Sequence, residues 1–154
     1  MKNMRRKDRE IDLNEAIGIL VASEYGVLST AGEDGQPYGI PLSYVYKEDA
    51  IYFHCAVAGQ TLDNIAINSK VSFCVVGTTK VLPETFGTLY ESVVVYGNAG
   101  EIHDTERHSA LVWLLEKYCS EFIKEGHHYI EAENHRTKVV KIEISRISGK
   151  ARRK

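Results

Sequence analysis

The feature that most constrains the fold of this chain is a series of short stretches in which apolar residues alternate. Connections of only a few residues join these stretches. Residues 38–47 place apolar side chains on one of two alternating faces, and residues 51–55 are β-branched and aromatic. Residues 31–37, which precede these stretches, carry two glycines and a proline, as hairpin turns do. Connections of this length join antiparallel strands, so the sequence predicts an antiparallel sheet.

The remaining segments predict a mainly β protein with helices, of the α+β class. Helical spacing predicts helices over 12–24, just after Gly59, and over 105–124, with Asp12 and Thr105 as caps. Leu13, Ile17, Leu20 and Val21 share one face of the first helix. Further strands are expected over 26–30, 71–77, 88–104 and 137–148, the third of them bent at Gly97 or Gly100. Residues 79–86 and 125–136 are expected to form loops. Because hairpins outnumber long crossovers, we expect the sheet to curl into a barrel that the helices plug or flank.

Length and composition exclude several classes of protein. A chain of 154 residues is expected to form one domain, residues 1–154. The formal net charge is −2, so the protein as a whole has no positive electrostatic field that would attract nucleic acid. No apolar run is long enough to form a membrane-spanning helix. Three widely spaced cysteines suit neither a disulfide framework nor a zinc knuckle. With no secretory signal in the basic N-terminal segment, the expected location is the cytoplasm.

The junction from His54 to Thr61 is the segment most suited to ligand binding. It joins a strand end to a helix start, where free backbone N–H groups favour a phosphate. An ordinary strand–helix turn explains the same pattern, and a lone histidine on a strand is more often structural than catalytic. Likewise, His127, His128 and His135 lie in a polar segment without metal-ligand spacing, so no metal site is predicted. The basic tail that includes Lys150 is usual for a solvated chain end, although it could reach a phosphate.

Five segments in order resemble the pyridoxamine 5′-phosphate oxidase-like flavoproteins, especially their nitroimidazole-resistance branch. The segments are MRRKDREI, GVLSTAGEDGQPYGIPLSYVY, IYFHCAVAGQTLDNIAINSKVSFCVVG, YESVVVYGNAGEI and VVKIEISRISGKARR. The resemblance runs from about Met4 to Arg153 and lies in the ordered set rather than in one motif. It implies an antiparallel split β-barrel of the FMN-binding type, in a homodimer with FMN at the subunit interface.

The resemblance also implies which residues hold the flavin. The isoalloxazine ring is expected against the backbone of Pro41, Leu42, Ser43 and Tyr44. The segment with His54, Ala56, Gly59, Gln60, Thr61 and Asn64 is expected to hold the ring edge and the phosphate. Ser92 would approach from one of the two subunits, and Lys150 could close the site. Gln60 and Thr61 are uncharged where the family often has a basic residue, and Cys55 stands where glycine is common.

The implied activity is that of an FMN-dependent oxidoreductase acting on a small molecule. The nitroimidazole-resistance branch suggests reduction of nitroaromatic compounds, with His54 as the candidate catalytic proton donor. A non-enzymatic carrier or sensor that binds flavin or haem is the alternative from another class. Oxidation of pyridoxamine 5′-phosphate is a further alternative, ranked lower because the sequence offers no convincing second phosphate site.

Overall fold

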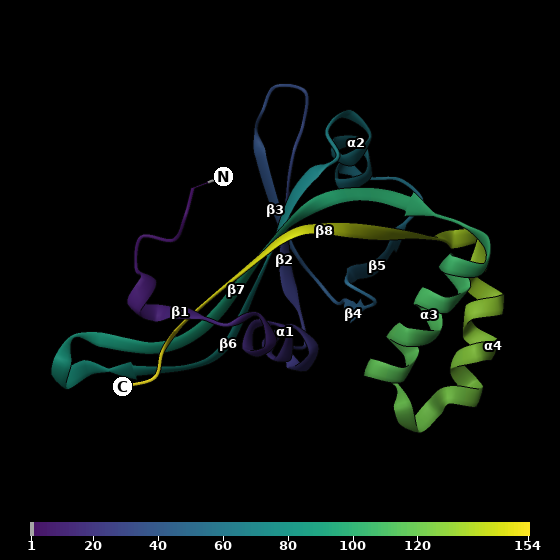
Figure 1. The fold of residues 1–154 in the computed structure, drawn as a ribbon. Helices are drawn as coiled ribbons and strands as arrows, with labels where there is room; N and C mark the ends of the chain where they lie inside the picture. The colour runs from purple at the N-terminus through teal and green to yellow at the C-terminus, as the bar shows by residue number, and fades with distance from the viewer. Residues whose placement is uncertain (1) are drawn as a thin grey trace.

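The structure is a computed structural model, and it describes residues 2–154 as a strongly twisted antiparallel sheet with helices around it (Figure 1). The strands are β1 (Glu10–Ile11), β2 (Gly26–Ala31), β3 (Pro37–Leu42), β4 (Val45–Lys47), β5 (Ala50–Ala56), β6 (Lys70–Leu82), β7 (Gly87–Ile102) and β8 (Thr137–Arg152). Their order is β3-β2-β6-β7-β8-β5-β4, and β1 adds to β8. Because β3 and β4 end this order without pairing to each other, the sheet is open, which confirms the predicted α+β split-barrel class.

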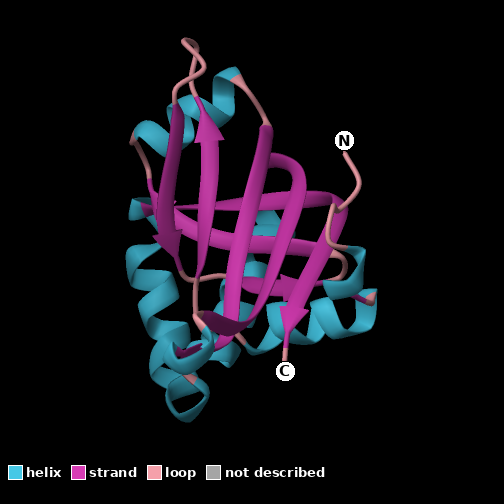
Figure 2. Ribbon diagram, turned by 90° about the vertical axis from the view of Figure 1, so that its left-hand side faces the viewer, coloured by secondary structure: helices cyan, strands magenta, loops and turns pink. Residues whose placement is uncertain are grey.

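Four helices surround the sheet, which runs in two crossing directions in Figure 2. They are α1 (Leu13–Ala22), α2 (Gln60–Ile67), α3 (Asp104–Tyr118) and α4 (Ile123–Glu133). The last two form a hairpin at one end of the molecule, and α2 lies near the turn of the β2–β3 hairpin (Figure 1). In the described residues no helix has both the length and the apolar character that crossing a membrane requires.

The interior consists of two apolar clusters on opposite sides of β5. Phe53 belongs to the larger cluster, inside the curled sheet, while its neighbour Tyr52 belongs to the smaller cluster beneath α3. Leu111 and Leu114 of α3 complete the smaller cluster. The alternation of side chains along a strand therefore lets one strand serve two cores.

The first helix begins as predicted but is rotated from the expected face. The Glu15 N–H donates to Asp12 Oδ1 over 2.9 Å, and the two residues form a capping box. Leu13 and Val21, however, are 58% and 54% exposed, while Ala16 is buried. The small Ala16 side chain lets the helix approach Gly149 of β8 closely, a contact that counting only large apolar residues overlooks.

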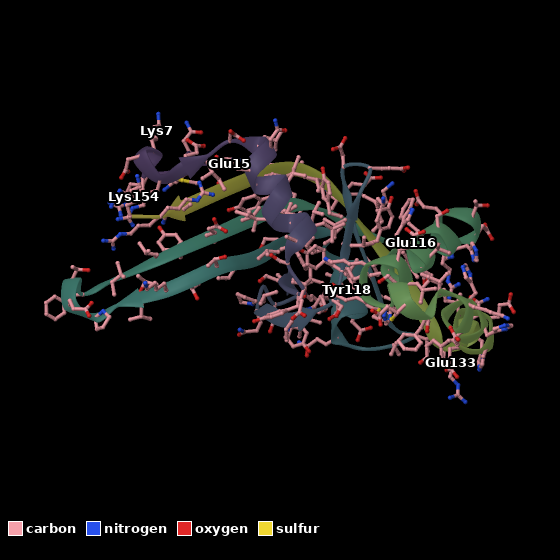
Figure 3. All side chains as sticks on the ribbon, turned by 90° about the horizontal axis from the view of Figure 1, so that it is seen from below. Lys7, Glu15, Glu116, Tyr118, Glu133 and Lys154 are labelled. Carbon is pink, nitrogen blue, oxygen red and sulfur yellow. The ribbon has the colours of Figure 1, made fainter. Side chains whose placement is uncertain are left out.

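Two predictions in the first two thirds of the chain are wrong. Residues 38–47 form two strands, because the ladder stops at Ser43 and Tyr44. Residues 79–86 are not a loop, since β6 continues to Leu82 and pairs with the start of β7 beyond a bulge after Val76. Pro83 interrupts only the tip, where a single 3-10 turn reverses the chain. A long β6–β7 arm results, and it projects away from the rest of the molecule (Figure 3).

The helical region near the C-terminus also differs from prediction. The helix expected over 105–124 ends at Tyr118, and its cap is His103 rather than Thr105. The segment 125–136, expected to be irregular, is mostly α4. No residue of α4 is buried, and its polar composition resembles that of a loop. The last strand continues four residues past the predicted end, to Arg152.

The predicted bend in β7 falls at Gly97. The register against β8 shifts between Tyr96 and Gly97, and Gly97 is buried. A Cβ atom at Gly97 would lie 2.2 Å from the backbone oxygen of Glu143, whereas one at Gly100 would meet nothing within 4 Å. Close approach of two backbones is what requires glycine at this position.

Candidate functional site

A cavity of about 360 Å³ lies between the α3–α4 hairpin and the strand ends below it. Its apolar wall comes from Leu111, Leu114, Leu115 and Ile130. Its polar lining comes from Ser43, His54, Arg107, Tyr118, Cys119, Tyr129, Glu133, Asn134 and Thr137. A concave apolar pocket with a few polar groups at its edge is the usual form of a small-molecule site.

Two of the residues predicted for the site, Ser43 and His54, meet at this cavity. His54 follows Tyr52 on the same face of β5, and where Tyr52 is covered by α3, His54 emerges into the open space. Cys55 points the other way and packs against the larger core. The predicted alternation of these residues is therefore confirmed.

The His54 imidazole has no hydrogen-bond partner among residues 2–154. Its ring is exposed at the cavity, yet the surrounding protein displaces enough water to lower the pKa of His54 from its usual value of 6.5. A histidine in this setting is mainly neutral at pH 7. Both ring nitrogens are free to exchange a proton with a ligand or to coordinate one.

Two residues of α3 that the sequence did not single out hold the backbone of Tyr44. The Tyr118 hydroxyl accepts from the Tyr44 N–H over 3.0 Å and lies 2.9 Å from the Tyr44 carbonyl oxygen. The Lys117 Nζ donates to the same carbonyl over 3.0 Å and lies 3.9 Å from the centre of the Tyr44 ring. Burial lowers the pKa of Lys117 to about 8. These contacts fix the strand break at Ser43 beside the cavity.

The Tyr44 side chain itself is fully buried in the larger core, where its hydroxyl donates to the carbonyl of Leu20. Only its backbone lies near the cavity, and the contacts from α3 occupy that backbone. Of the predicted group 41–44, Ser43 alone lines the cavity. Pro41 and Leu42 lie in the edge strand β3, opposite Val27 and Gly26 of β2.

Arg107 is a second cavity residue that the sequence did not reveal. Its Nη2 donates to the backbone oxygens of Asn134 and Thr137, over 2.9 and 2.8 Å. No carboxylate lies within ion-pairing distance of it in the described part of the chain. Arg107 thus joins α3 to the start of β8 and leaves a positive charge at the cavity wall. Sequence periodicity does not reveal this role of Arg107, because the residue it contacts at the start of β8 lies 30 positions away in the chain.

The predicted phosphate segment begins α2. Gly59 is its N-cap, with φ of 151°, and no side chain caps the exposed N-terminal turn. Asn64 is buried, and its Nδ2 donates to Thr30 Oγ1 over 3.0 Å, which anchors α2 to β2. Ala56, Gln60 and Thr61 lie at or near the surface of this segment. The open turn has the geometry that the sequence predicted for a phosphate site, and binding there stays a prediction.

Ser92 and Lys150 lie far from the cavity. They face each other across β7 and β8, toward the end of the molecule where the chain terminates, whereas α3 and α4 lie at the opposite end (Figure 1). One chain therefore does not bring all the predicted site residues together.

The histidines of the helical hairpin do not gather with other ligands. Within residues 2–154 no group of three or more His, Cys, Asp or Glu side chains has a metal-binding arrangement.

The fold and cavity define a class: an open antiparallel split barrel with a small-molecule pocket beneath a helical hairpin. A model of the pyridoxamine 5′-phosphate oxidase family matches residues 12–151, and the chain belongs to this family. The family resemblance drawn from the sequence is confirmed.

Solved structures give the same fold. A proposed 5-nitroimidazole antibiotic resistance protein from Bacteroides thetaiotaomicron is 19% identical, with a TM-score of 0.73 over 92% of this chain and 86% of that one. An FAD-binding protein from Mesorhizobium loti is 25% identical, with a TM-score of 0.66 over 94% and 98%. An FAD- and haem-binding protein from Mycobacterium smegmatis is 17% identical, with a TM-score of 0.81 over 95% and 74%. A search of curated proteins finds no match.

Proposed function

We propose that the protein is an FMN-dependent oxidoreductase that reduces small aromatic molecules, nitroaromatic compounds among them, as a homodimer. The observation that carries the proposal is the apolar cavity at which Ser43 and the unpartnered His54 meet. Family membership supports the flavin, and the nitroimidazole-resistance protein among the similar structures supports the substrate class.

The bound flavin would supply the hydride or electron pair, and the protein would supply position and protons. The apolar wall formed by the leucines of α3 would accept a flat ring and exclude water. A ring nitrogen of His54 would deliver a proton to the reduced substrate. Arg107 would attract an anionic or strongly dipolar group such as a nitro group, because its charge has no carboxylate partner.

The homodimer is supported by an exposed apolar surface on the outer face of the sheet and on its arm. Val27, Cys74 and Val76 lie on that outer face, where Val27 and Val76 are 37% and 59% exposed. The arm adds Val81 and Phe86, which are 68% and 99% exposed. Apolar side chains grouped on a projecting element are typical of an interface. Ser92 lies on this outer face opposite Val76, so a partner chain seated there would be close to it.

Two measurements test the proposal. The purified protein's visible spectrum should show the two broad bands of a flavin in the blue and near ultraviolet. Turnover should then follow when a chemical reductant and a nitroimidazole are added. A colourless protein that takes up no added FMN contradicts the proposal, as does a flavin-loaded protein that transfers electrons to no nitroaromatic compound. Pyridoxamine 5′-phosphate, tested as a third substrate, separates this activity from that of the parent family.

The free imidazole of His54 also favours a second function, that of a non-enzymatic carrier of haem or flavin. A neutral histidine facing an apolar cavity could supply a nitrogen ligand to haem iron. An intense Soret band after haem addition, lost in His54→Ala, would support the haem carrier. A flavin spectrum without turnover would support the flavin carrier.

A further inference from the structure

The strand break between β3 and β4 leaves backbone groups that the sheet does not satisfy. β3 ends at Leu42 and β4 begins at Val45, so Ser43 and Tyr44 lie between the two strands. Tyr44 is fully buried, and a buried peptide N–H or carbonyl without a partner is costly. The partners of Tyr44 come from outside the sheet, from the last turn of α3.

Lys117 and Tyr118, called the α3 clamp below, satisfy three backbone groups with two side chains. The Tyr44 N–H donates to the Tyr118 hydroxyl, and Lys117 Nζ donates to the Tyr44 carbonyl. A phenol has a single proton to donate. Because Lys117 already serves the Tyr44 carbonyl, the Tyr118 proton is available for the carbonyl of Glu24, two residues beyond α1. The α3 clamp thus joins the strand break to the end of α1.

The side chain of Tyr44 is held as firmly as its backbone. Its hydroxyl donates to the Leu20 carbonyl of α1, and its ring meets that of Phe73 in β6 edge-on, with ring centres 4.7 Å apart. The Lys117 ammonium lies over the same ring, 3.9 Å from its centre. Since α1, β6 and α3 all fix Tyr44, the backbone of the preceding residue, Ser43, has a defined direction.

Lys117 is committed to Tyr44 alone. Within residues 2–154 no carboxylate lies within 4.0 Å of its ammonium, although the side chain is half-buried. A lysine held in one geometry loses the rotamer freedom that it would keep at an exposed position. That loss is spent on one hydrogen bond and one cation–π contact, both with the same residue.

The end of α3 that carries the clamp also forms part of the cavity wall. Tyr118 and Cys119 line the cavity together with Leu114 and Leu115, and Ser43 lines it from the strand side. In Figure 3, Tyr118 lies between the strands and the α3–α4 hairpin. The α3 clamp therefore lies where the helical and strand walls of the cavity meet, and it fixes the position of Ser43 relative to the leucines of α3.

We propose that Lys117 and Tyr118 are positioning residues, which hold Ser43 toward the cavity and thereby set the affinity for the aromatic substrate. The inference rests on the proposed function, because it takes a nitroaromatic compound as the ligand of the cavity. His54, the proton donor of that proposal, is held independently by the pairing of β5 with β8, where it lies opposite Val139. Loss of the α3 clamp should therefore weaken substrate binding and leave proton transfer intact.

Tyr118→Phe tests the α3 clamp, because it removes the hydroxyl and keeps the ring. Amide hydrogen exchange followed by NMR should become at least 10-fold faster at Tyr44 and stay unchanged in β5. The Kd of a 5-nitroimidazole, measured by calorimetry on the unreduced protein, should rise at least 10-fold. Tyr25→Phe is the matched control, because Tyr25 is 60% exposed and lies outside the cavity lining. It should change neither the exchange nor the Kd.

Lys117→Met provides a second variant, in case Tyr118→Phe folds poorly. It keeps an apolar stem over the Tyr44 ring and removes the donor to the Tyr44 carbonyl, so the Kd should again rise. Lys124→Met is its control, since Lys124 is an exposed lysine of α4 outside the cavity lining. In turnover assays both clamp variants should raise KM and leave kcat within about twofold of the native value.

Several results would overturn the inference. They are unchanged exchange at Tyr44 in Tyr118→Phe, an unchanged Kd despite faster exchange, a kcat that falls as far as KM rises, and an equal loss of affinity in the control variants. A lower melting temperature with native Kd would mean that the clamp is only structural. If the native protein binds the nitroimidazole but reduces none, the proposed function fails, while exchange and Kd still decide the role of the clamp.

Discussion

The His54 side chain provides the most direct test of chemistry at the cavity. If a ring nitrogen of His54 delivers a proton, turnover should fall as pH rises through the pKa of His54, because the protonated fraction declines. Burial lowers this pKa, so the falling limb should lie below pH 6.5. We expect His54→Ala to remove the limb and to reduce nitroaromatic turnover about 100-fold. Steady-state rates across pH 5–8 provide the measurement.

The same substitution distinguishes catalysis from a structural role. In the native protein His54 takes up a proton less readily than in the unfolded chain, so native stability falls as pH drops below 6.5. His54→Ala should remove that loss and leave stability at pH 7 unchanged, since the ring is exposed and makes no hydrogen bond. Lower stability with normal turnover per folded molecule would assign His54 a structural role instead.

Thr61 tests the predicted phosphate segment. The open first turn of α2 offers backbone N–H groups but no positive side chain. We expect Thr61→Lys to tighten FMN binding by about 1 kcal/mol, through one charge-assisted contact with the phosphate. Riboflavin, which lacks the phosphate, should gain little. Fluorescence quenching titrations with both ligands give the two affinities.

A matched control adds the same charge at the other end of that helix. Ile67 is 59% exposed and is the last residue of α2, so Ile67→Lys should leave FMN affinity unchanged. Equal gains for FMN and riboflavin in Thr61→Lys, or weaker FMN binding, would show that the phosphate does not lie at this turn.

At the residue scale, the sequence revealed residues whose signals are local. His54 stands out because it lies at the predicted junction between a strand and a helix, whereas Ser43 was expected at the site only from the family resemblance. Arg107 and Lys117 do not, because their roles arise from contacts with residues 30 and 73 positions away in the chain. Helical periodicity indicates which face of a helix is buried. It does not indicate which distant groups a polar side chain at the edge of that face will contact.

At the element scale, the bend in β7 distinguishes two glycines that the sequence leaves equivalent. Gly97→Ala should lower the free energy of unfolding by about 1–3 kcal/mol, because the new Cβ would collide with the backbone of Glu143. Gly100→Ala, three residues along the same strand, meets nothing and should leave stability unchanged or raise it slightly. Urea unfolding of the two variants measures the difference, and similar losses in both would place the bend elsewhere.

The elements that the sequence misread share one physical reason. The β6–β7 arm and α4 each bury little apolar surface within the chain: α4 has no buried residue, and most of β6 beyond Val76 is exposed. Pro83 suggested a loop, although it occupies only the hairpin tip. Elements that pack on both sides, such as β5, were predicted to within a residue or two.

At the scale of the whole molecule, the sequence predicted the architecture, and the family resemblance implied a site shared by two subunits, but neither indicated which of the expected residues lie at opposite ends of one chain. Hairpin connections indicated the antiparallel barrel, and the open edge between β3 and β4 agrees with a split barrel. Ser92 and Lys150 lie at the end of the molecule opposite His54. This separation depends on the long-range pairing of β7 with β8. Register across such distant strands leaves no mark on local sequence.

The separated site residues and the exposed arm together predict a homodimer. Light scattering at micromolar concentration should give twice the chain mass, and Val76→Glu with Phe86→Glu should shift the protein toward monomer with loss of flavin. Each glutamate would place a charge in an apolar interface, which is unfavourable without a partner.

Phe122→Glu is the matched control for the arm. Phe122 is 60% exposed at the turn between α3 and α4, at the end of the molecule opposite the arm (Figure 1). The Phe122→Glu substitution introduces the same glutamate side chain as Phe86→Glu, but it should leave dimer formation and flavin binding unchanged. A flavin-loaded monomer would contradict the dimer, because a single chain would then complete a site whose predicted residues lie at both of its ends. Equal dissociation by Phe86→Glu and Phe122→Glu would instead place the interface outside the arm.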